Sequence, residues 1–213
     1  MHYLRNEIPG IKTLQPEKLK KFYNRVAWFR TKKTFSHKGS TPDARKLELL
    51  LSATAILLTI GLRKYKYFRT VNKIIIYPTD YYSVLHKRQH LGEFNFGLKT
   101  LVFAADSVVE GFKDDTDNLN LAIHEFAHAL YFETSGRSNW QALRFQWGFR
   151  KLERFFEVHK QSLANAEVGI RSYAFTNIFE FFAVLLEHFF ESPEELAKEQ
   201  PEMYSILRSM LNQ

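Results

Sequence analysis

The stretch His124-Glu125-Phe126-Ala127-His128 lies in an apolar segment, from about Asp117 to Tyr131, that is predicted to form a helix. Two histidines four residues apart project from the same side of a helix, about one turn apart along its axis. Both imidazoles can therefore reach one metal ion, and the glutamate between them is placed to act on a water molecule at that ion. The pattern predicts a zinc-dependent hydrolase.

The residues around this motif favour a buried helix over a chance match. Apolar side chains recur through the segment, at Leu119, Leu121, Ala122, Phe126, Ala127 and Leu130. Candidate capping residues and negative charge precede it, at Asp114, Asp115, Asp117 and Asn118. The simpler alternative is a partly exposed helix on which the two histidines have no ligand and Glu125 is merely solvated.

The rest of the chain predicts an α+β fold that is mostly helical and has a small β-sheet. Helices are expected at Pro16–Phe29, through Leu47–Leu62 after a start at Thr41-Pro42, at Trp140–Lys160, at Asn177–Glu191, and from a capping box at Ser192 to about Leu211. Strands are expected at Val71–Tyr77 and Lys99–Ala104. The connections are a basic stretch at Thr31–Ser40, a loop or short irregular elements at Tyr81–Gly97, a turn at Thr134–Asn139 and an unclear stretch at Glu167–Thr176.

Charge is distributed unevenly along the chain. Residues 1–70 hold 16 Lys and Arg against 4 Asp and Glu, a net charge of +12, whereas the remaining 14 and 19 give −5, in agreement with +7 overall. Such a basic region could meet nucleic acid, an anionic membrane surface or an acidic protein. Solvated faces of amphipathic helices are the simpler explanation, and no nucleic-acid-binding motif supports nucleic acid as a partner.

The 213-residue chain contains no cysteine, so a metal ion must be held by His, Asp or Glu. Residues Met1 to Gln15 lack the apolar core of a signal peptide. The longest apolar run, Leu47–Leu62, includes polar residues and is shorter than the roughly 20 residues that span a bilayer. These features predict a cytoplasmic protein without a membrane span.

A catalytic zinc ion usually has three protein ligands, and the motif supplies two of them. Candidates for the third are Glu153, Glu157, His159, Glu167, Glu180, Glu187 and His188, and spacing alone does not choose among them. Glu180 stands out because a carboxylate early in a strongly apolar helix lies either near a solvated end or at a functional position. The alternative is that Asn177 and Glu180 form a capping box.

Two blocks of the sequence resemble the MtfA family of zinc metallopeptidases, peptidase family M90. One is Ile123–His128 with its upstream strands Ile74–Pro78 and Leu101–Phe103, and the other is Arg171–Val184 with Glu187, Phe189, Phe190 and Pro193-Glu194. The similarity covers roughly residues 45–196. It implies a zincin-like metallopeptidase domain at 41–213, preceded by a basic helical extension at 1–40, the two packed as one unit.

The resemblance also implies roles for individual residues. His124, His128 and Glu180 would bind one Zn²⁺ per chain, Glu125 would be the general base, and Tyr173 would stabilise the transition state. The Tyr-to-Glu spacing is similar to that of the anthrax lethal factor catalytic domain. Glu187 would either support a ligating histidine or be an exposed residue paired with a cation.

Some positions depart from the family pattern. Ala129-Leu130-Tyr131 follow the second histidine where the family often has Lys-Leu-Asp, and Val184 stands where thermolysin-like enzymes carry a carboxylate.

The predicted function is hydrolysis of a peptide or protein substrate by a gluzincin-type enzyme, of which an aminopeptidase is one form. Lys99–Ala104 is expected to be an edge strand that pairs with the substrate, and the alternative is a strand that only packs within the sheet. The alternative is a regulatory protein that binds a transcription regulator and has weak peptidase activity.

Overall fold

The computed structural model describes residues 4, 7–8, 10–11, 14–41, 43–63, 68–83, 87–114, 116–165 and 172–213. Its α-helices are α2 Pro16–Lys32, α3 Ala44–Thr59, α4 Ala105–Glu110, α5 Leu121–Thr134, α6 Trp140–Asn165, α7 Ile178–Glu191, α8 Pro193–Glu199 and α9 Pro201–Leu211. A short 3₁₀ helix, η1, spans Ser172–Thr176. The strands are β1 Thr34–His37, β2 Lys73–Tyr77, β3 Tyr81–Ser83, β4 Arg88–His90, β5 Gly92–Asn95 and β6 Thr100–Ala104. The predicted α+β fold, mostly helical with a small sheet, is confirmed.

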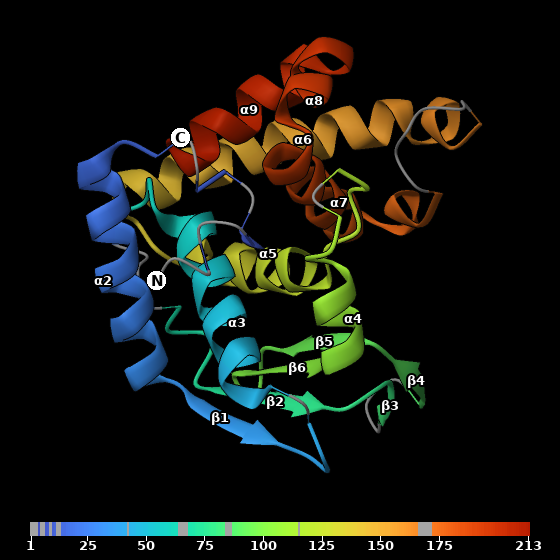
Figure 1. The fold of residues 1–213 in the computed structure, drawn as a ribbon. Coiled ribbons are helices and arrows are strands. Elements are labelled where there is room, and N and C mark those ends of the chain that lie inside the picture. Colours follow the sequence, from blue (N-terminus) through green and yellow to red (C-terminus); the bar gives the residue numbers. More distant parts are fainter. Residues whose placement is uncertain are drawn as a thin grey trace.

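Four strands form a mixed sheet at one end of the molecule, in the order β1-β2-β6-β5 (Figure 1). β1, β2 and β6 are parallel, whereas β5 runs antiparallel to β6. β6 therefore has a partner on both sides, and the prediction that Lys99–Ala104 is an edge strand is wrong. The edge next to α5 is β5, which lies in the stretch expected to be a loop or short irregular elements.

Helix α5 is anchored to the sheet by Phe126, one of the two variable residues of the histidine motif. The Phe126 ring is fully buried against three other rings: Phe29 of α2, Phe103 of β6, and Phe68, which precedes β2. Its centroid lies 5.4–6.3 Å from theirs. Aromatic side chains of this size bury large apolar areas, so this cluster orients α5 firmly. The opposite side of the helix, with His124 and His128, is thereby directed away from the sheet.

Several predicted helix ends differ from the observed ones. α5 begins at Leu121, not near Asp117, because the Asn120 side chain caps it by accepting a hydrogen bond from the Ile123 N–H at 3.1 Å. α3 begins at Ala44 after Asp43, which has a positive φ of 48°; Thr41 is not its cap, and Pro42 lies outside the described residues.

The C-terminal region differs in the same way. Ser192 makes no capping hydrogen bond, so the predicted capping box is wrong. The single terminal helix is in fact two, α8 and α9, because Pro201 lacks an N–H and forces Gln200 out of the helical conformation.

Near the N-terminus, Thr34–His37 was expected to be part of a connection but forms strand β1.

In the described part of the chain, no helix is both long and apolar enough to cross a bilayer. The division into an extension at residues 1–40 and a domain at 41–213 remains a prediction.

Candidate metal centre

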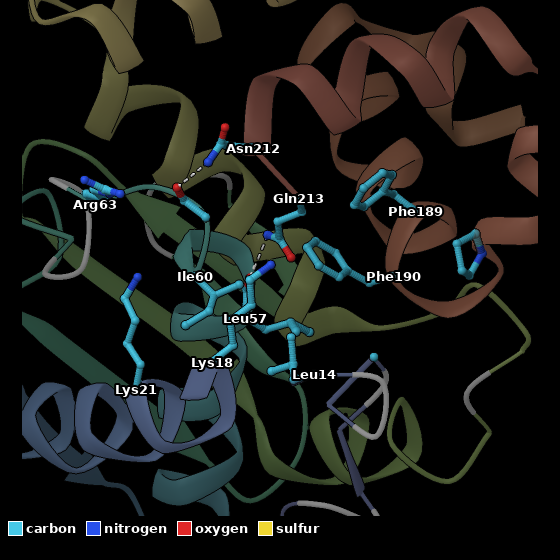
Figure 2. Close-up of a pocket in the computed structure, with 13 residues that line it drawn as sticks. Leu14, Lys18, Lys21, Leu57, Ile60, Arg63, Phe189, Phe190, Asn212 and Gln213 are labelled. Carbon is cyan, nitrogen blue, oxygen red and sulfur yellow. Dashed lines mark hydrogen bonds between the residues drawn. The ribbon is translucent and has the colours of Figure 1, made fainter. Parts of the chain in front are cut away.

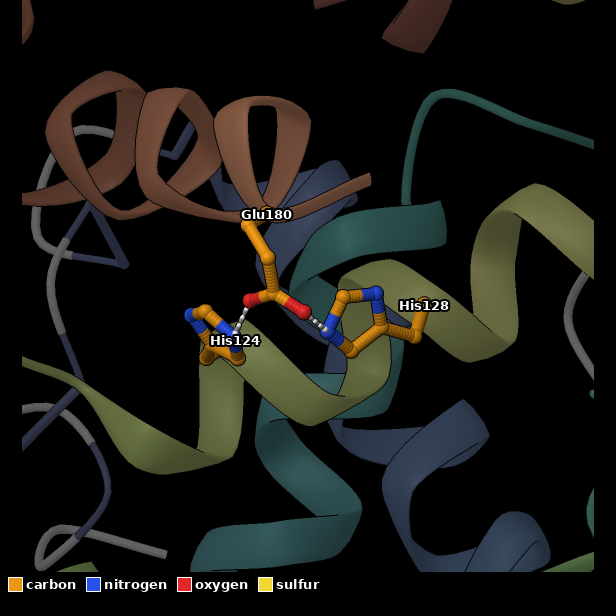
Figure 3. Close-up of side chains that lie close together, drawn as sticks. All are labelled: His124, His128 and Glu180. Carbon is orange, nitrogen blue, oxygen red and sulfur yellow. Dashed lines mark hydrogen bonds and ion pairs between the residues drawn. The ribbon is translucent and has the colours of Figure 1, made fainter. Parts of the chain in front are cut away.

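Two helices bring the three predicted ligands together. His124 and His128 come from α5, and Glu180 comes from the first turn of α7 (Figure 3). Glu180 Oε2 lies 2.9 Å from His124 Nε2, and its Oε1 lies 3.7 Å from His128 Nε2. One donor atom from each residue falls within 4.8 Å of the other two. Among the described His, Asp and Glu residues, no other group of three could hold a metal ion.

The donor set fits a zinc ion. Zinc in catalytic sites takes imidazole nitrogens and carboxylate oxygens at about 2.0–2.2 Å, and tetrahedral geometry then places the ligand atoms roughly 3.3 Å apart. The two distances from Glu180 to the imidazoles lie on either side of that value. The two distances involve different oxygens of Glu180, and one donor atom from each residue lies within 4.8 Å of the other two, so the side chains must rotate before all three reach one ion.

The Glu180 carboxylate is oriented toward the histidines by its position at the start of α7. The Asn177 side chain caps this helix by accepting hydrogen bonds from the N–H groups of Phe179 and Glu180, at 2.9 and 3.1 Å. In a complete capping box the glutamate side chain would return to Asn177. Here its two oxygens face His124 and His128 instead, so the cap and the candidate ligand coexist.

Glu187 supports His124 from the other side of the imidazole ring. It is buried on α7, and its Oε1 lies 2.8 Å from His124 Nδ1 while its Oε2 accepts a hydrogen bond from the Asn120 N–H at 2.8 Å. A partner of this kind fixes the tautomer and orientation of a metal-binding histidine. The alternative of an exposed residue paired with a cation is therefore wrong.

The charges in the site prepare it for a cation. Burial lowers the pKa of His124, but the hydrogen bonds to Glu180 and Glu187 outweigh burial and raise this pKa to about 10. Burial, followed by repulsion from His124, lowers the pKa of His128 to about 4. Burial raises the pKa of Glu180, but the hydrogen bond from His124 and the charges of both histidines lower it overall. Glu180 is thus a carboxylate, and His128 offers a free lone pair.

Glu125 and Tyr173, the two predicted catalytic residues, lie beside the three donors. Glu125 is on α5 and only 6% exposed, whereas Tyr173 is on η1 and half-exposed. The Tyr173 hydroxyl makes a hydrogen bond with Glu180, and burial is the main cause that raises the pKa of Tyr173 to about 12. The five residues predicted from the sequence therefore lie in one place.

Two cavities of about 430 and 280 Å³ adjoin the site. Both are lined by His90, Gly92, His124, Glu125 and Tyr173. The larger extends toward Glu110 and Asp117, and the smaller toward the aromatic residues Phe94, Phe132 and Phe179. The donors thus lie in an open cleft that runs along strand β5.

Comparison with known proteins agrees with this geometry. The model of the glucose-regulated metallo-peptidase M90 family matches residues 1–211. The chain belongs to this family. It is therefore a metallopeptidase by family, and its expected substrates are peptides. The uncharacterized protein slr2042 of Synechocystis sp. is 25% identical over 221 residues, which cover 96% of this chain and 80% of that protein.

Some contributors to this M90 site were not identified from the sequence. Asn120 was not among the predicted caps, although an Asn directly before an apolar helical run is a sequence signal for one. Gly92 was missed because what matters about it is its close approach to the Glu125 side chain, which is distant in the sequence. Of the other candidate third ligands, Glu157 forms an ion pair with Lys160 on α6, and Glu167 lies outside the described residues.

We predict that Glu187→Gln weakens metal binding about 10- to 100-fold, because the amide cannot offer two acceptor oxygens to Asn120 and His124. Competition with a chromophoric chelator measures the affinity. Glu194→Gln, an exposed change at the start of α8, is the matched control and should leave the affinity unchanged. Equal affinity of Glu187→Gln and wild type, with both folded by circular dichroism, would contradict the role of Glu187.

We predict that zinc binding releases about one proton near pH 7.5. In the metal-free protein His124 has a pKa of about 10 and is protonated at this pH, and the metal must displace that proton. Affinity should therefore rise with pH between 6 and 8. Calorimetric titration in two buffers of different ionisation enthalpy measures the released proton; heats that do not depend on the buffer would refute the prediction.

Proposed function

We propose that this M90 metallopeptidase is a zinc enzyme of the gluzincin type, in which His124, His128 and Glu180 bind the ion and Glu125 is the general base. The observation that supports the proposal is the convergence of the three donor atoms within 4.8 Å, although Glu180 lies more than 50 positions after the two histidines in the sequence. Convergence of this kind is required for a catalytic zinc site and is not expected of a chance motif.

Glu125 is suited to move a proton. A bound zinc ion would supply Lewis-acid polarisation of the peptide carbonyl and would acidify water at the site. Burial raises the pKa of the Glu125 carboxyl to about 7; the His124 charge opposes the rise and the carboxylates of Glu180 and Glu93 add to it. A group with a pKa near neutrality can accept a proton from the attacking water and return it to the leaving amine.

Tyr173 is suited to bind the developing oxyanion. Its pKa is raised, so the hydroxyl keeps its proton at neutral pH and can donate a hydrogen bond. Its ring centroid lies 6.2 Å from that of His124, at the border of both cavities. A hydrogen-bond donor at this place stabilises negative charge that appears only in the transition state.

Strand β5 is the part of the site suited to hold a peptide. As one of the two edge strands of the sheet it can pair with an extended peptide through backbone hydrogen bonds. Gly92 of β5 lies directly against the general base: a Cβ atom at this position would be 2.8 Å from both Cγ and Oε1 of Glu125. Only glycine therefore allows β5 to lie this close to Glu125.

No described feature favours the alternative function of binding a transcription regulator, so we do not propose it.

The first test measures metal content and cleavage together. Wild type purified without chelator should contain about one zinc per chain, and His128→Ala and Glu180→Gln should lose most of it. Glu125→Gln should keep the zinc but lose about 100-fold or more of the cleavage of a peptide library, because only the proton acceptor is removed.

Mass spectrometry of the cleaved peptides separates removal of N-terminal residues from internal cleavage. A wild type that stays empty when zinc is supplied, or a Glu125→Gln variant with full activity, would refute the proposal.

We predict that Gly92→Ala reduces kcat at least about tenfold while zinc content is unchanged, because the added methyl group displaces the Glu125 carboxyl. Gly97→Ala is the matched control, since its Cβ would meet only Asn95 Oδ1 at an ordinary 3.6 Å. Steady-state kinetics on one peptide from the library compares the two variants. Full activity of Gly92→Ala would show that the contact with Glu125 does not matter.

A further inference from the structure

The metal centre makes no use of the basic first third of the chain, but a cavity elsewhere in the molecule is lined by residues from it. This cavity, of about 440 Å³, lies where the start of α2, the end of α3, the end of α7 and residues 212–213 meet (Figure 2). Three cations line it: Lys18 and Lys21 from α2, and Arg63 after α3. Its volume is within the roughly 300–1,000 Å³ typical of small-molecule sites.

The remaining walls of this cavity are mostly apolar. Phe189 and Phe190 come from the last turns of α7 and Leu57 from α3, and Leu14, Ile60 and Pro193 are also apolar. The rest of the lining is Gly10, Gly61, Asn212 and Gln213. In Figure 2 the two phenylalanines lie on the opposite side of the cavity from Lys21 and Arg63. A ligand in this space would meet positive charge on one side and apolar surface on the other.

The three cations are not needed to satisfy the ends of the surrounding helices. The Arg25 guanidinium already donates hydrogen bonds to the carbonyls of Thr59 and Ile60, at 3.2 and 3.4 Å. The side-chain amides of Asn212 and Gln213 donate to the carbonyls of Gly61 and Leu57, at 3.1 and 3.0 Å. Stabilisation of helix C-termini therefore does not account for Lys18, Lys21 and Arg63.

The cations also repel one another. Burial lowers the pKa of Lys21, and the charges of Arg25, Arg63 and Lys18 lower it further. None of the ion pairs found in the described residues involves Lys18, Lys21 or Arg63. An anion placed among the three would relieve this repulsion, since opposite charges at close range favour both ionised forms.

We propose that this cavity binds a small amphipathic anion, an apolar chain or ring that ends in a carboxylate or phosphate group. Lys18, Lys21 and Arg63 would hold the anionic group, and Phe189, Phe190 and Leu57 would cover the apolar part. A fully polar anion such as inorganic phosphate would leave the apolar walls uncovered and would bind weakly.

The cavity is separate from the metal centre. The two sites share no lining residue, and Phe189 follows Glu180 by nine residues on α7, which is about 14 Å along a helix. Changes at the cavity therefore need not disturb the zinc ligands, and binding can be tested apart from peptidase activity.

The test titrates full-length protein with dodecanoate and, separately, with dodecyl phosphate, by calorimetry. At least one should bind, the comparison shows which head group is preferred, and affinity should fall as salt is added. The double variant Lys18→Gln/Lys21→Gln should weaken binding about tenfold or more. Lys20→Gln is the matched control, an exposed lysine on the same helix that does not line the cavity, and should change affinity less than about twofold.

Inorganic phosphate and dodecyltrimethylammonium, which each lack one half of the required chemistry, should bind at least about tenfold more weakly than the better anion. The proposal is overturned if neither anionic amphiphile binds with a Kd below about 1 mM. It is also overturned if dodecyltrimethylammonium binds equally well, or if the double variant binds like the lysine control.

Discussion

The arrangement of the metal centre depends on the buried carboxylate of Glu187. This single side chain of α7 accepts a hydrogen bond from the backbone of Asn120, at the start of α5, and faces the Nδ1 atom of His124. A buried charge without partners is strongly unfavourable, so α7 cannot slide or rotate on α5 without losing both contacts. Together with the hydrogen bond from the Asn120 side-chain amide to Glu191, this contact holds the two helices in their relative position.

The position of Glu180 follows from this contact. Seven residues separate Glu180 from Glu187, which is about two helical turns, so both carboxylates project from the same side of α7. With Glu187 at Nδ1 of the His124 ring, Glu180 lies at Nε2 of the same ring and reaches His128 with its second oxygen. The imidazole is thus held between two carboxylates, with Nδ1 directed to the buried Glu187 and Nε2 to Glu180 and the proposed metal position.

The two ends of α7 lie in regions of opposite charge. The acidic side chains of Glu125, Glu180 and Glu187 surround the two histidines, and a set of carboxylate and imidazole donors is suited to a divalent cation. At the other end of α7 the excess is positive, because cations from the start of α2 and from the end of α3 gather at one cavity. One helix therefore contributes to the proposed metal site and to the proposed anion site.

The sequence alone was sufficient where the relevant physics is local. Hydrophobic periodicity placed α5, α7 and strands β2 and β6, and the i, i+4 spacing of His124 and His128 follows from helix geometry. The ends of elements were predicted less well. Asn120 competes with several neighbouring acidic residues as the cap of α5, and only the packing of Asn120 against Gly111 and Glu191 shows which residue starts the helix.

Only the tertiary structure decided the features that depend on contacts between distant segments. Spacing could not choose between Glu180 and Glu187 as the residue beside His124 Nε2, since both lie on one face of one helix. Spacing also could not show that β5 is the edge strand beside α5, or that Gly92 lies against Glu125, because register and strand order are set by pairing across the sheet. Long-range packing of α7 on α5, and of β5 on β6, decides these contacts, and no local pattern in the sequence encodes it.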